Sequence, residues 1–396
     1  MRYPPVKLNP QGLKNFIQGR IWFTLGEIES YDKVKDSIEP GSLVSIYSRD
    51  GHFLGQGYFN PHSFYNLKIL TRRECPIDTP FFRERFRMAL SLREKTLPGE
   101  SSFRLVHAEG DHLPGLVIDI FDKVGVIQIH TLGMEKLKLH ILEALLQLIP
   151  LDSIVFKNDL EKRKEEGLPL YVDIYLREPQ DPYPVLMDGI KFLLPLTKGQ
   201  KTGFFLDQRE NRRFLQSIAK GSVVMDGFAY LGGFSFYALK GGARRAYLLE
   251  RSGYALEIAL EIAKLNGFKD KIVPVEGDVF QLLKNPVAYS DLLILDPPAF
   301  IKSRKDFSQG YKKYKSLMDL ALNFFREREG LLFFFSCSHF FKLQDLQELL
   351  KELLPKKGFS SGIIKFFHQG LDHPVNPLVE ETEYLKGVAL KLSRGS

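Results

Sequence analysis

The sequence predicts an α/β fold for its C-terminal half, with a mostly parallel, Rossmann-like sheet that carries helices on both faces. Three observations support this prediction. Short apolar strands alternate regularly with helical segments from about residue 197 onward. A glycine-rich turn separates the first of these strands from its helix. Polar residues follow successive strand ends, which is where ligands bind in parallel sheets of this kind.

Two smaller domains are predicted ahead of this sheet. Residues 1–74 predict a β-rich domain, because short strand-like runs flank the turn signal Asp50-Gly51. Residues 75–196 mix strands and helices in an order typical of a small α+β domain. The predicted strands are Leu43–Tyr47, Gly57–Phe59, Lys68–Leu70, Leu116–Phe121, Val124–Thr131, Ser153–Phe156 and Val172–Leu176; the predicted helices are Phe81–Lys95 and Glu135–Leu148, and Lys157–Gly167 is expected to be a loop.

The third domain, residues 197–396, contains the alternating pattern. Its predicted strands are Val223–Met225, Ala246–Leu249, Ile272–Val275, Leu292–Leu295, Leu331–Phe335, Ile363–Phe367 and Tyr384–Leu392. Its predicted helices are one that ends at Gly241-Gly242, then Tyr254–Leu265, Tyr311–Phe325 and Leu343–Leu354. Repeated βα units of this kind require a mostly parallel sheet with helices on both faces.

The composition favours some classes of protein and excludes others. The net charge of +7 over 396 residues favours a polyanionic partner, although only weakly. Two cysteines, Cys75 and Cys337, are too few for a disulfide framework or a CxxC metal cluster, so we expect no bound metal and a reducing, cytoplasmic compartment. Met1–Leu13 lacks the apolar core of a signal peptide, and the apolar run Leu331–Phe335 is too short to cross a bilayer. We therefore expect no contact with a membrane.

The first candidate site is the turn after Val223–Met225. Glycines at a strand-to-helix turn let a ligand approach the backbone, and the following helix offers free N–H groups. The spacing is not that of the dinucleotide GxGxxG motif, which argues against a nicotinamide cofactor. The turn residues predicted to bind a cofactor are Asp226, Gly227, Tyr230, Gly232, Gly233 and Phe234.

Two acidic residues follow the next two strands. Glu250, with Arg251 beside it, lies about where an acid would bind a pair of ribose hydroxyls. Asp278, followed by Val279, could accept a hydrogen bond from an adenine amino group. Each acid alone is more often a helix N-cap or a surface charge. In this order, the turn and the two acids predict an adenosyl pocket of the S-adenosylmethionine (SAM) type.

Two further motifs point to the chemistry. Asp296-Pro297-Pro298 follows an apolar strand, and the prolines would hold Asp296 rigidly at the mouth of the pocket. Cys337, between Ser336 and Ser338, follows the next strand of the sheet. A lone cysteine is usually a small buried hydrophobe. At this strand end, however, a thiolate suits nucleophilic addition to a pyrimidine ring.

Basic residues in the N-terminal segment allow two interpretations, a solvated surface or an RNA-binding module. Phosphates require Lys and Arg but no fixed motif. The candidate RNA-binding residues are Arg20, Arg49, Lys68, Arg72 and Arg73.

Several of these motifs together resemble the RlmI-type 23S rRNA cytosine-C5 methyltransferases. The resemblance covers nearly the whole chain. Its motifs in the third domain are Lys201–Arg209, Tyr230–Phe234, Asp296-Pro297-Pro298 and Ser336-Cys337-Ser338. Its motifs in the first two domains are Gly57–Pro61, Leu70–Arg72, Arg104–Asp111 and Leu113-Pro114-Gly115.

This resemblance implies an RNA-binding PUA domain, a central α+β domain and a class I methyltransferase domain. It implies SAM as cofactor, 23S ribosomal RNA as partner, and positions for Asp207 and Gln208 beside the methionine part of SAM; it leaves a homodimer open. Two departures matter. The family often has lysine where this chain has Ala299. Other RNA cytosine-C5 enzymes have a second cysteine there, so release by a second cysteine is not expected.

The mechanism that we hypothesise begins with attack of Cys337 on C6 of an unstacked cytosine. Asp296, protonated or close to N3, would neutralise charge that develops on the ring. The base that removes the C5 proton is not identified by the sequence.

Other functions remain open at this stage. An amino-group methyltransferase would use the Asp296-Pro297-Pro298 element and an aromatic residue, here Phe300, and would need no cysteine. A non-catalytic RNA-binding protein with a vestigial Rossmann domain is a second alternative. A nicotinamide-dependent dehydrogenase fits least well.

Overall fold

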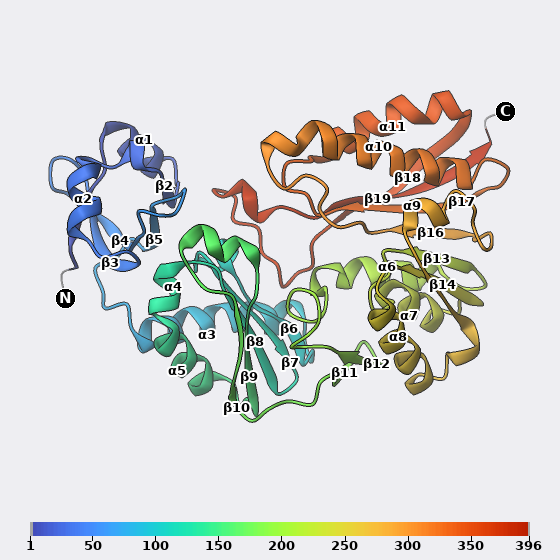
Figure 1. Ribbon diagram of the computed structural model, residues 1–396, viewed down its shortest axis with the longest axis horizontal. Helices are drawn as coiled ribbons and strands as arrows, with labels where there is room; N and C mark the ends of the chain where they lie inside the picture. Colours follow the sequence, from blue (N-terminus) through green and yellow to red (C-terminus); the bar gives the residue numbers. More distant parts are fainter. Residues whose placement is uncertain (1–2, 395–396) are drawn as a thin grey trace. The chain divides into compact units, whose positions relative to one another are not determined.

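A computed structural model describes residues 3–394, which form two compact units (Figure 1). Of the described residues, the first unit comprises those up to 185 together with 194–206 and 371–382, and the second comprises 186–193, 207–370 and those from 383 onward. Both units therefore draw on segments that are distant in the sequence. The hairpin of β11 (Tyr183–Met187) and β12 (Ile190–Leu194) lies where the chain first passes from one unit to the other.

The first unit begins with a five-stranded sheet in the order β1-β3-β4-β5-β2. Strands β3, β4 and β5 pair antiparallel, and the predicted turn Asp50-Gly51 connects the first two of them. The prediction missed β1, β2 and two short helices, because these elements are too brief to show a period. The elements are β1 (Pro5–Lys7), α1 (Pro10–Ile17), β2 (Trp22–Phe23), α2 (Tyr31–Ser37), β3 (Ser42–Tyr47), β4 (Phe53–Phe59) and β5 (Leu67–Thr71).

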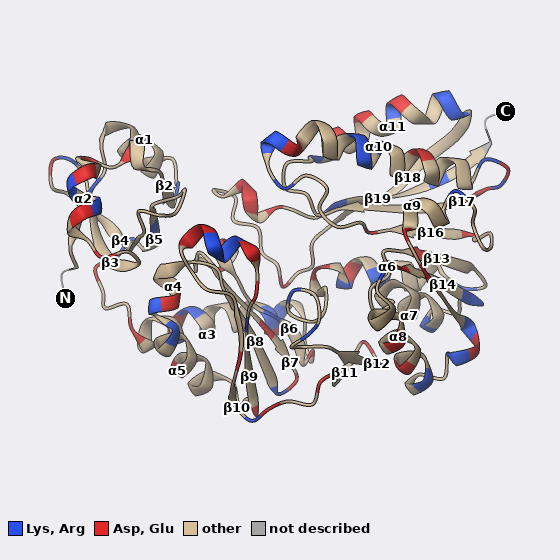
Figure 2. Ribbon diagram, in the orientation of Figure 1, with Lys and Arg blue, Asp and Glu red and all other residues tan. Residues whose placement is uncertain are grey.

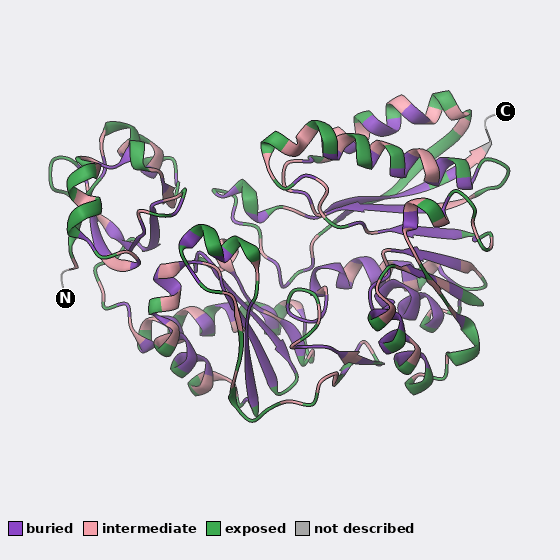
Figure 3. Ribbon diagram, in the orientation of Figure 1, coloured by how far each residue is buried: buried purple, intermediate pink, exposed green. Residues whose placement is uncertain are grey.

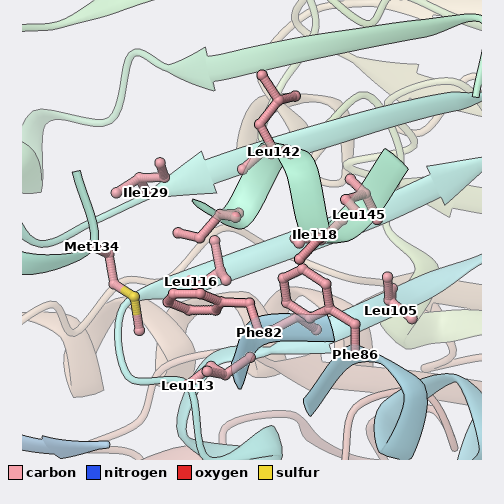
Figure 4. Packing of buried hydrophobic residues seen from close by; sticks show 14 of the residues in the cluster. Phe82, Phe86, Leu105, Leu113, Leu116, Ile118, Ile129, Met134, Leu142 and Leu145 are labelled. Carbon is pink, nitrogen blue, oxygen red and sulfur yellow. The ribbon is translucent and has the colours of Figure 1, made fainter. Parts of the chain in front are cut away.

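A second sheet of the first unit has the order β10-β9-β8-β7-β6, and α3 and α5 pack on it. Figure 4 shows Phe82 and Phe86 of α3 among Leu116, Ile118 and Leu145 in this buried core. The helix predicted over residues 135–148 is interrupted at Leu137, and a 3₁₀ helix, Glu161–Glu166, replaces part of the predicted loop. The elements are α3 (Thr79–Thr96), β6 (Ser102–His107), β7 (Leu116–Phe121), β8 (Val124–Ile129), α4 (Leu132–Lys136), α5 (Lys138–Leu148), β9 (Ser153–Asn158) and β10 (Tyr171–Leu176).

Buried ion pairs explain the motif Arg104–Asp111. Arg93 of α3 is 1% exposed and donates to both carboxylate oxygens of Asp111, at 2.6 and 2.7 Å. It also donates to the carbonyl oxygen of Asp372, at 2.8 Å, and the carboxylate of Asp372 accepts from the backbone N–H of Arg104. Asp372 lies between β18 (Phe359–His368) and β19 (Lys386–Arg394) in the sequence, yet these bonds fasten it inside the first unit.

The second unit is built on a seven-stranded sheet in the order β15-β14-β13-β16-β17-β19-β18. The first five strands run parallel, and β19 runs antiparallel to its neighbours β17 and β18. Helices α10 and α11 cover one face and α7 and α8 the other (Figure 1). The inner strands β13, β16 and β17 are largely buried (Figure 3), whereas most residues of the outer strands β15 and β18 are not. The predicted parallel α/β sheet is confirmed.

Each predicted element of this unit is present, and the prediction missed the helices α6 and α9 and the β11–β12 hairpin. The elements are α6 (Arg209–Ile218), β13 (Val223–Gly227), α7 (Gly233–Lys240), β14 (Arg245–Glu250), α8 (Gly253–Leu265), β15 (Ile272–Glu276), α9 (Val279–Leu282), β16 (Leu292–Leu295), α10 (Phe307–Phe324), β17 (Gly330–Ser336), α11 (Leu343–Lys357), β18 (Phe359–His368) and β19 (Lys386–Arg394). No helix within residues 3–394 is long and apolar enough to cross a membrane.

The ion pair of Arg93 should contribute strongly to the stability of the first unit. Replacing Arg93 with Ala leaves the carboxylate of Asp111 buried without its partner, which costs about 3–5 kcal/mol. Urea denaturation should show this loss. Arg87→Ala is the matched control, because Arg87 lies on the same helix and its ion pair with Glu84 is exposed. Its expected cost is below about 1 kcal/mol, and equal losses in the two variants would contradict the role given to Arg93.

Candidate active site

The turn after β13 is tightly curled. Phe228, Tyr230 and Gly232 have φ values of 65°, 50° and 76°, all in the left-handed region. Such values are unfavourable for non-glycine residues and persist only where the surroundings hold them. The carboxylate of Glu250 helps to do so, because it accepts a hydrogen bond of 2.9 Å from the backbone N–H of Tyr230. A Cβ at Gly232 would lie 2.7 Å from Cδ2 of Leu248, so the contact and the left-handed φ together favour glycine here.

Asp226 and Glu250 have different roles at this turn. The Asp226 carboxylate is buried and accepts from the backbone N–H and hydroxyl of Ser235, at 3.2 and 2.8 Å. Burial raises the pKa of Asp226 to about 7, although the bonds from Ser235 oppose this shift. Asp226 therefore fastens the start of α7. Glu250 is only partly buried, and each of its oxygens accepts one backbone bond, from Tyr230 and from Ser252, which leaves further lone pairs for a ligand.

The next strand end carries Asp278 and an apolar wall. Asp278 caps α9 and forms an ion pair of 2.7 Å with Arg251, which follows the neighbouring strand β14. Phe280 is half-buried, and its ring lies 6.4 Å from that of Phe228 and 6.0 Å from that of Phe300. The sequence analysis missed Phe280, although it follows Asp278 and Val279 directly in the chain. Flat aromatic rings beside an acidic residue suit a purine base.

These residues fit an adenosyl group. Glu250 offers acceptors for hydroxyls, and the Phe280 wall adjoins Asp278. Gly227, Gly232 and Gly233 let the turn pack closely on Leu295, Leu248 and Arg212, which a side chain at these positions would prevent. Val279 is buried and packs against Gly227 of the turn, and Phe234 is also buried. Within residues 3–394 no group of three His, Cys, Asp or Glu side chains could hold a metal ion.

Gln208 links the N-terminal end of α6 to the Asp296 motif. Its amide Nε2 donates to Asp296 Oδ2 at 3.0 Å, and its Oε1 accepts from Asn211 at 2.6 Å. Asp207 is buried and accepts from the hydroxyl of Tyr384, at 2.6 Å. The structure therefore brings Gln208 to Asp296, whereas it fastens Asp207 to the segment before β19.

Cys337 lies beside the Asp296 motif. Its Sγ is 3.9 Å from the carbonyl oxygen of Pro297, toward which the thiol donates. A buried hydroxyl network joins the two loops, because Ser338 Oγ accepts from the backbone N–H of Ile301 at 3.1 Å and lies 2.7 Å from the hydroxyl of Tyr314. Parallel neighbours β16 and β17 thus deliver an acid and a thiol to the same edge of the sheet.

The candidate RNA-binding residues differ in their surroundings. Arg72 and Arg73 are exposed, and Arg72 lies 4.3 Å over the ring of Phe16. Arg20 and Arg49 form ion pairs of 3.0 and 3.7 Å with Glu27 and Glu29. Lys and Arg alternate with Asp and Glu along α2, as Figure 2 shows, so positive charge is not segregated on that helix.

The prediction that Lys68 contacts RNA is wrong. Its ammonium group is buried and bonded to Ser63 Oγ, to the carbonyl oxygen of Tyr65 and to Glu166 Oε1, each at about 3 Å. A phosphate could reach it only if these bonds were broken. Lys68 is thus an internal ion-pair partner, which its position in a short strand does not reveal.

Comparison with known proteins agrees with this geometry. A family model described as S-adenosylmethionine-dependent methyltransferase matches residues 171–323, and a PUA-like domain model matches residues 6–72. The PUA-like N-terminal domain and the SAM cofactor are therefore confirmed. Whether the three domains divide at residues 74 and 196 stays a prediction.

Curated relatives match nearly the whole chain. The ribosomal RNA large subunit methyltransferase I of Vibrio vulnificus strain CMCP6 is 32% identical over 371 residues, which cover 91% of this chain and 93% of the relative. The protein of the same name from Pseudoalteromonas atlantica is 32% identical over 98% of this chain and 99% of its own length. A solved methyltransferase structure, in complex with SAH, superposes with a TM-score of 0.83 over 99% of this chain and 100% of the other, at 21% identity, and shows the fold alone.

Replacing Glu250 should weaken adenosyl binding. Glu250→Ala removes the acceptor that holds the N–H of Tyr230 and any bond to a ribose hydroxyl, at a cost of about 1.5–3 kcal/mol per charged hydrogen bond. Calorimetric titration with S-adenosylhomocysteine measures this effect. Glu276→Ala is the matched control, because Glu276 lies opposite Glu250 on β15 and is exposed. The assignment fails if both variants bind as tightly as the unchanged protein.

Proposed function

The chain belongs to the ribosomal RNA large subunit methyltransferase I family, and from this membership we propose that it methylates C5 of a cytosine in 23S ribosomal RNA. SAM is its methyl donor. The observation that carries the choice of C5 is the position of Cys337, 3.9 Å from Pro297 O in the Asp296-Pro297 motif. Methylation of an exocyclic nitrogen would require no thiol at this position.

Cys337 acts first in the proposed mechanism. Its thiolate forms a bond to C6 of the cytosine, and the electrons of the C5–C6 double bond move onto the ring. Asp296, positioned by Gln208, holds a proton close to N3 and neutralises the charge that collects there. Bound SAM supplies the methyl group that C5 acquires.

The product is then released from the enzyme. A base, for which water in the site suffices, takes the C5 proton. The electrons of that C–H bond restore the C5–C6 double bond, and the bond between C6 and Sγ breaks with return of the thiolate. Cys337 is the one cysteine of the third predicted domain, so the same side chain adds and leaves.

RNA binding by the N-terminal PUA-like domain is part of this proposal. Arg72, Arg73, Arg20 and Arg49 are all exposed and support it, because backbone recognition requires accessible cations. We also propose the cytoplasm as its compartment, since ribosomal RNA is the substrate and both cysteines are free thiols. The homodimer stays a prediction.

The Cys337 mechanism can be tested by trapping. RNA that contains 5-fluorocytosine cannot lose its C5 substituent as a proton, so it should accumulate as a covalent adduct of the enzyme in the presence of SAM. Cys337→Ala should form no adduct and should lose methylation by orders of magnitude, while its affinity for S-adenosylhomocysteine stays unchanged. Cys75→Ser is the control and should trap RNA normally. Nucleoside analysis that finds a methylated nitrogen, or an adduct without Cys337, would support the amino-group alternative.

The arginines of the PUA-like domain should set the salt dependence of RNA binding. Removing one cation that neutralises an RNA phosphate lowers the slope of log K against log salt by about 0.7–0.9. In the double variant Arg72→Ala, Arg73→Ala the slope should therefore fall by up to about twice this amount. Fluorescence titrations at several salt concentrations measure the slope. Arg244→Ala, an exposed arginine of the second unit, is the control. An unchanged slope in the double variant would remove these residues from the RNA interface.

A further inference from the structure

Lys386 is a buried lysine behind the proposed nucleophile. It begins β19, opposite Ser336 of β17 in the antiparallel pair, and is 5% exposed. Its Nζ donates to the carbonyl oxygens of Ser338 and Phe341, each at 2.7 Å. These acceptors lie in residues 337–342, which we call the Cys337 loop. The side chain of Lys386, which belongs to β19, therefore holds the Cys337 loop at two points, Ser338 and Phe341.

The burial of this ammonium group is costly. Lysine is rarely buried unless it is paired with an opposite charge. Among residues 3–394, however, the partners of its Nζ are the two neutral carbonyl groups. Burial and the charge of Lys342 lower the pKa of Lys386 to about 8, and the charges of Cys337, Glu383 and Asp345 oppose that shift. A thiolate at Cys337 thus stabilises the ammonium, and the ammonium stabilises the thiolate by the same interaction.

The opposite side of the loop is fixed independently. Ser336 Oγ donates to the hydroxyl of Tyr314 at 2.8 Å and accepts from the backbone N–H of Ser338 at 3.2 Å. Tyr314 is fully buried on α10. The residues before and after Cys337 are therefore held by neutral hydroxyls, whereas Lys386 adds a positive charge to the site.

We propose that Lys386 is a positioning residue for Cys337, which holds the Cys337 loop through two backbone hydrogen bonds and favours the thiolate form of Cys337 through its charge. This role rests on the proposed function, in which that thiolate adds to the pyrimidine. In this role the buried charge of Lys386 promotes the reaction, because a thiol that is protonated at neutral pH adds to the ring slowly.

Other charged groups around Cys337 act in different directions. Asp296 lies beside Pro297 and disfavours a thiolate when it is ionised. Tyr314 is neutral near pH 7, because burial raises its pKa. His339 belongs to the Cys337 loop, and its ring packs on Phe340. Lys342, in the same loop, is exposed; solvent weakens its charge, which still contributes to the lowered pKa of Lys386.

The pH dependence of Cys337 alkylation tests this role without RNA or SAM. In a Cys75→Ser background Cys337 is the remaining thiol, and iodoacetamide reports its thiolate fraction. Lys386→Met should raise the midpoint of the alkylation profile by about one pH unit and slow alkylation at pH 7 roughly tenfold. Lys342→Met removes an exposed charge from the same loop and should move the midpoint much less than Lys386→Met does. The pH–rate profile of methylation should move with the alkylation midpoint.

A midpoint that is the same in Lys386→Met and in the unchanged protein would overturn the proposal. If Lys386→Met does not fold, Lys386→Arg decides instead, because arginine keeps its charge at every pH used. Its midpoint should lie at or below that of the unchanged protein, and a higher midpoint would contradict the electrostatic role. The proposed function is tested separately, and it fails if Cys337→Ala still forms 5-methylcytosine. That result would not contradict an effect of Lys386 on the alkylation of the Cys337 thiol.

Discussion

The carboxyl ends of the parallel strands meet at one edge of the seven-stranded sheet, and the proposed active site depends on this constraint. The chain leaves β13 in one direction and later returns to β16 on the other side, so β13 and β16 are neighbours from which the connections diverge. A crevice forms where connections diverge in this way. Glu250 and Asp278 lie on one side of that point, and Asp296 and Cys337 lie on the other. The cofactor residues and the reacting residues are thus separated by the topology of the sheet, before any side-chain packing is considered.

The sequence was sufficient to predict residues whose position follows from a strand end. Asp226, Glu250, Asp278, Asp296 and Cys337 all follow apolar strands that were recognised by composition. Lys386 and Tyr314 could not be predicted in the same way. Tyr314 lies inside a helix and Lys386 begins the last strand, and their importance depends on the antiparallel return of β19 and on the packing of α10, which sequence periodicity does not encode. Lys68 shows the converse, because a basic residue near a predicted RNA-binding surface proved to be buried against Glu166.

The loops that carry Asp296 and Cys337 are supported by directional contacts more than by apolar packing. A methyl group tolerates many orientations of its neighbours, whereas a hydroxyl between two partners fixes distance and angle together. Ser336, Ser338 and Tyr314 form such a set beneath the site. Buried polar networks of this kind are costly when they are incomplete. When such a network is complete, it favours one loop geometry over the alternatives. The proposed reaction requires this, because the thiol must be aligned with a single ring carbon.

The passage of residues 371–382 into the first unit has a consequence for biosynthesis. Arg93 and Asp111 leave the ribosome early, but Asp372 follows 261 residues after Asp111. At a translation rate of ~5–20 residues per second, this interval is on the order of 10–50 s. During that time the N-terminal half of the nascent chain lacks one acceptor of its buried guanidinium and the acceptor for the N–H of Arg104. Its folding can therefore be completed only after residues 371–382 have been added.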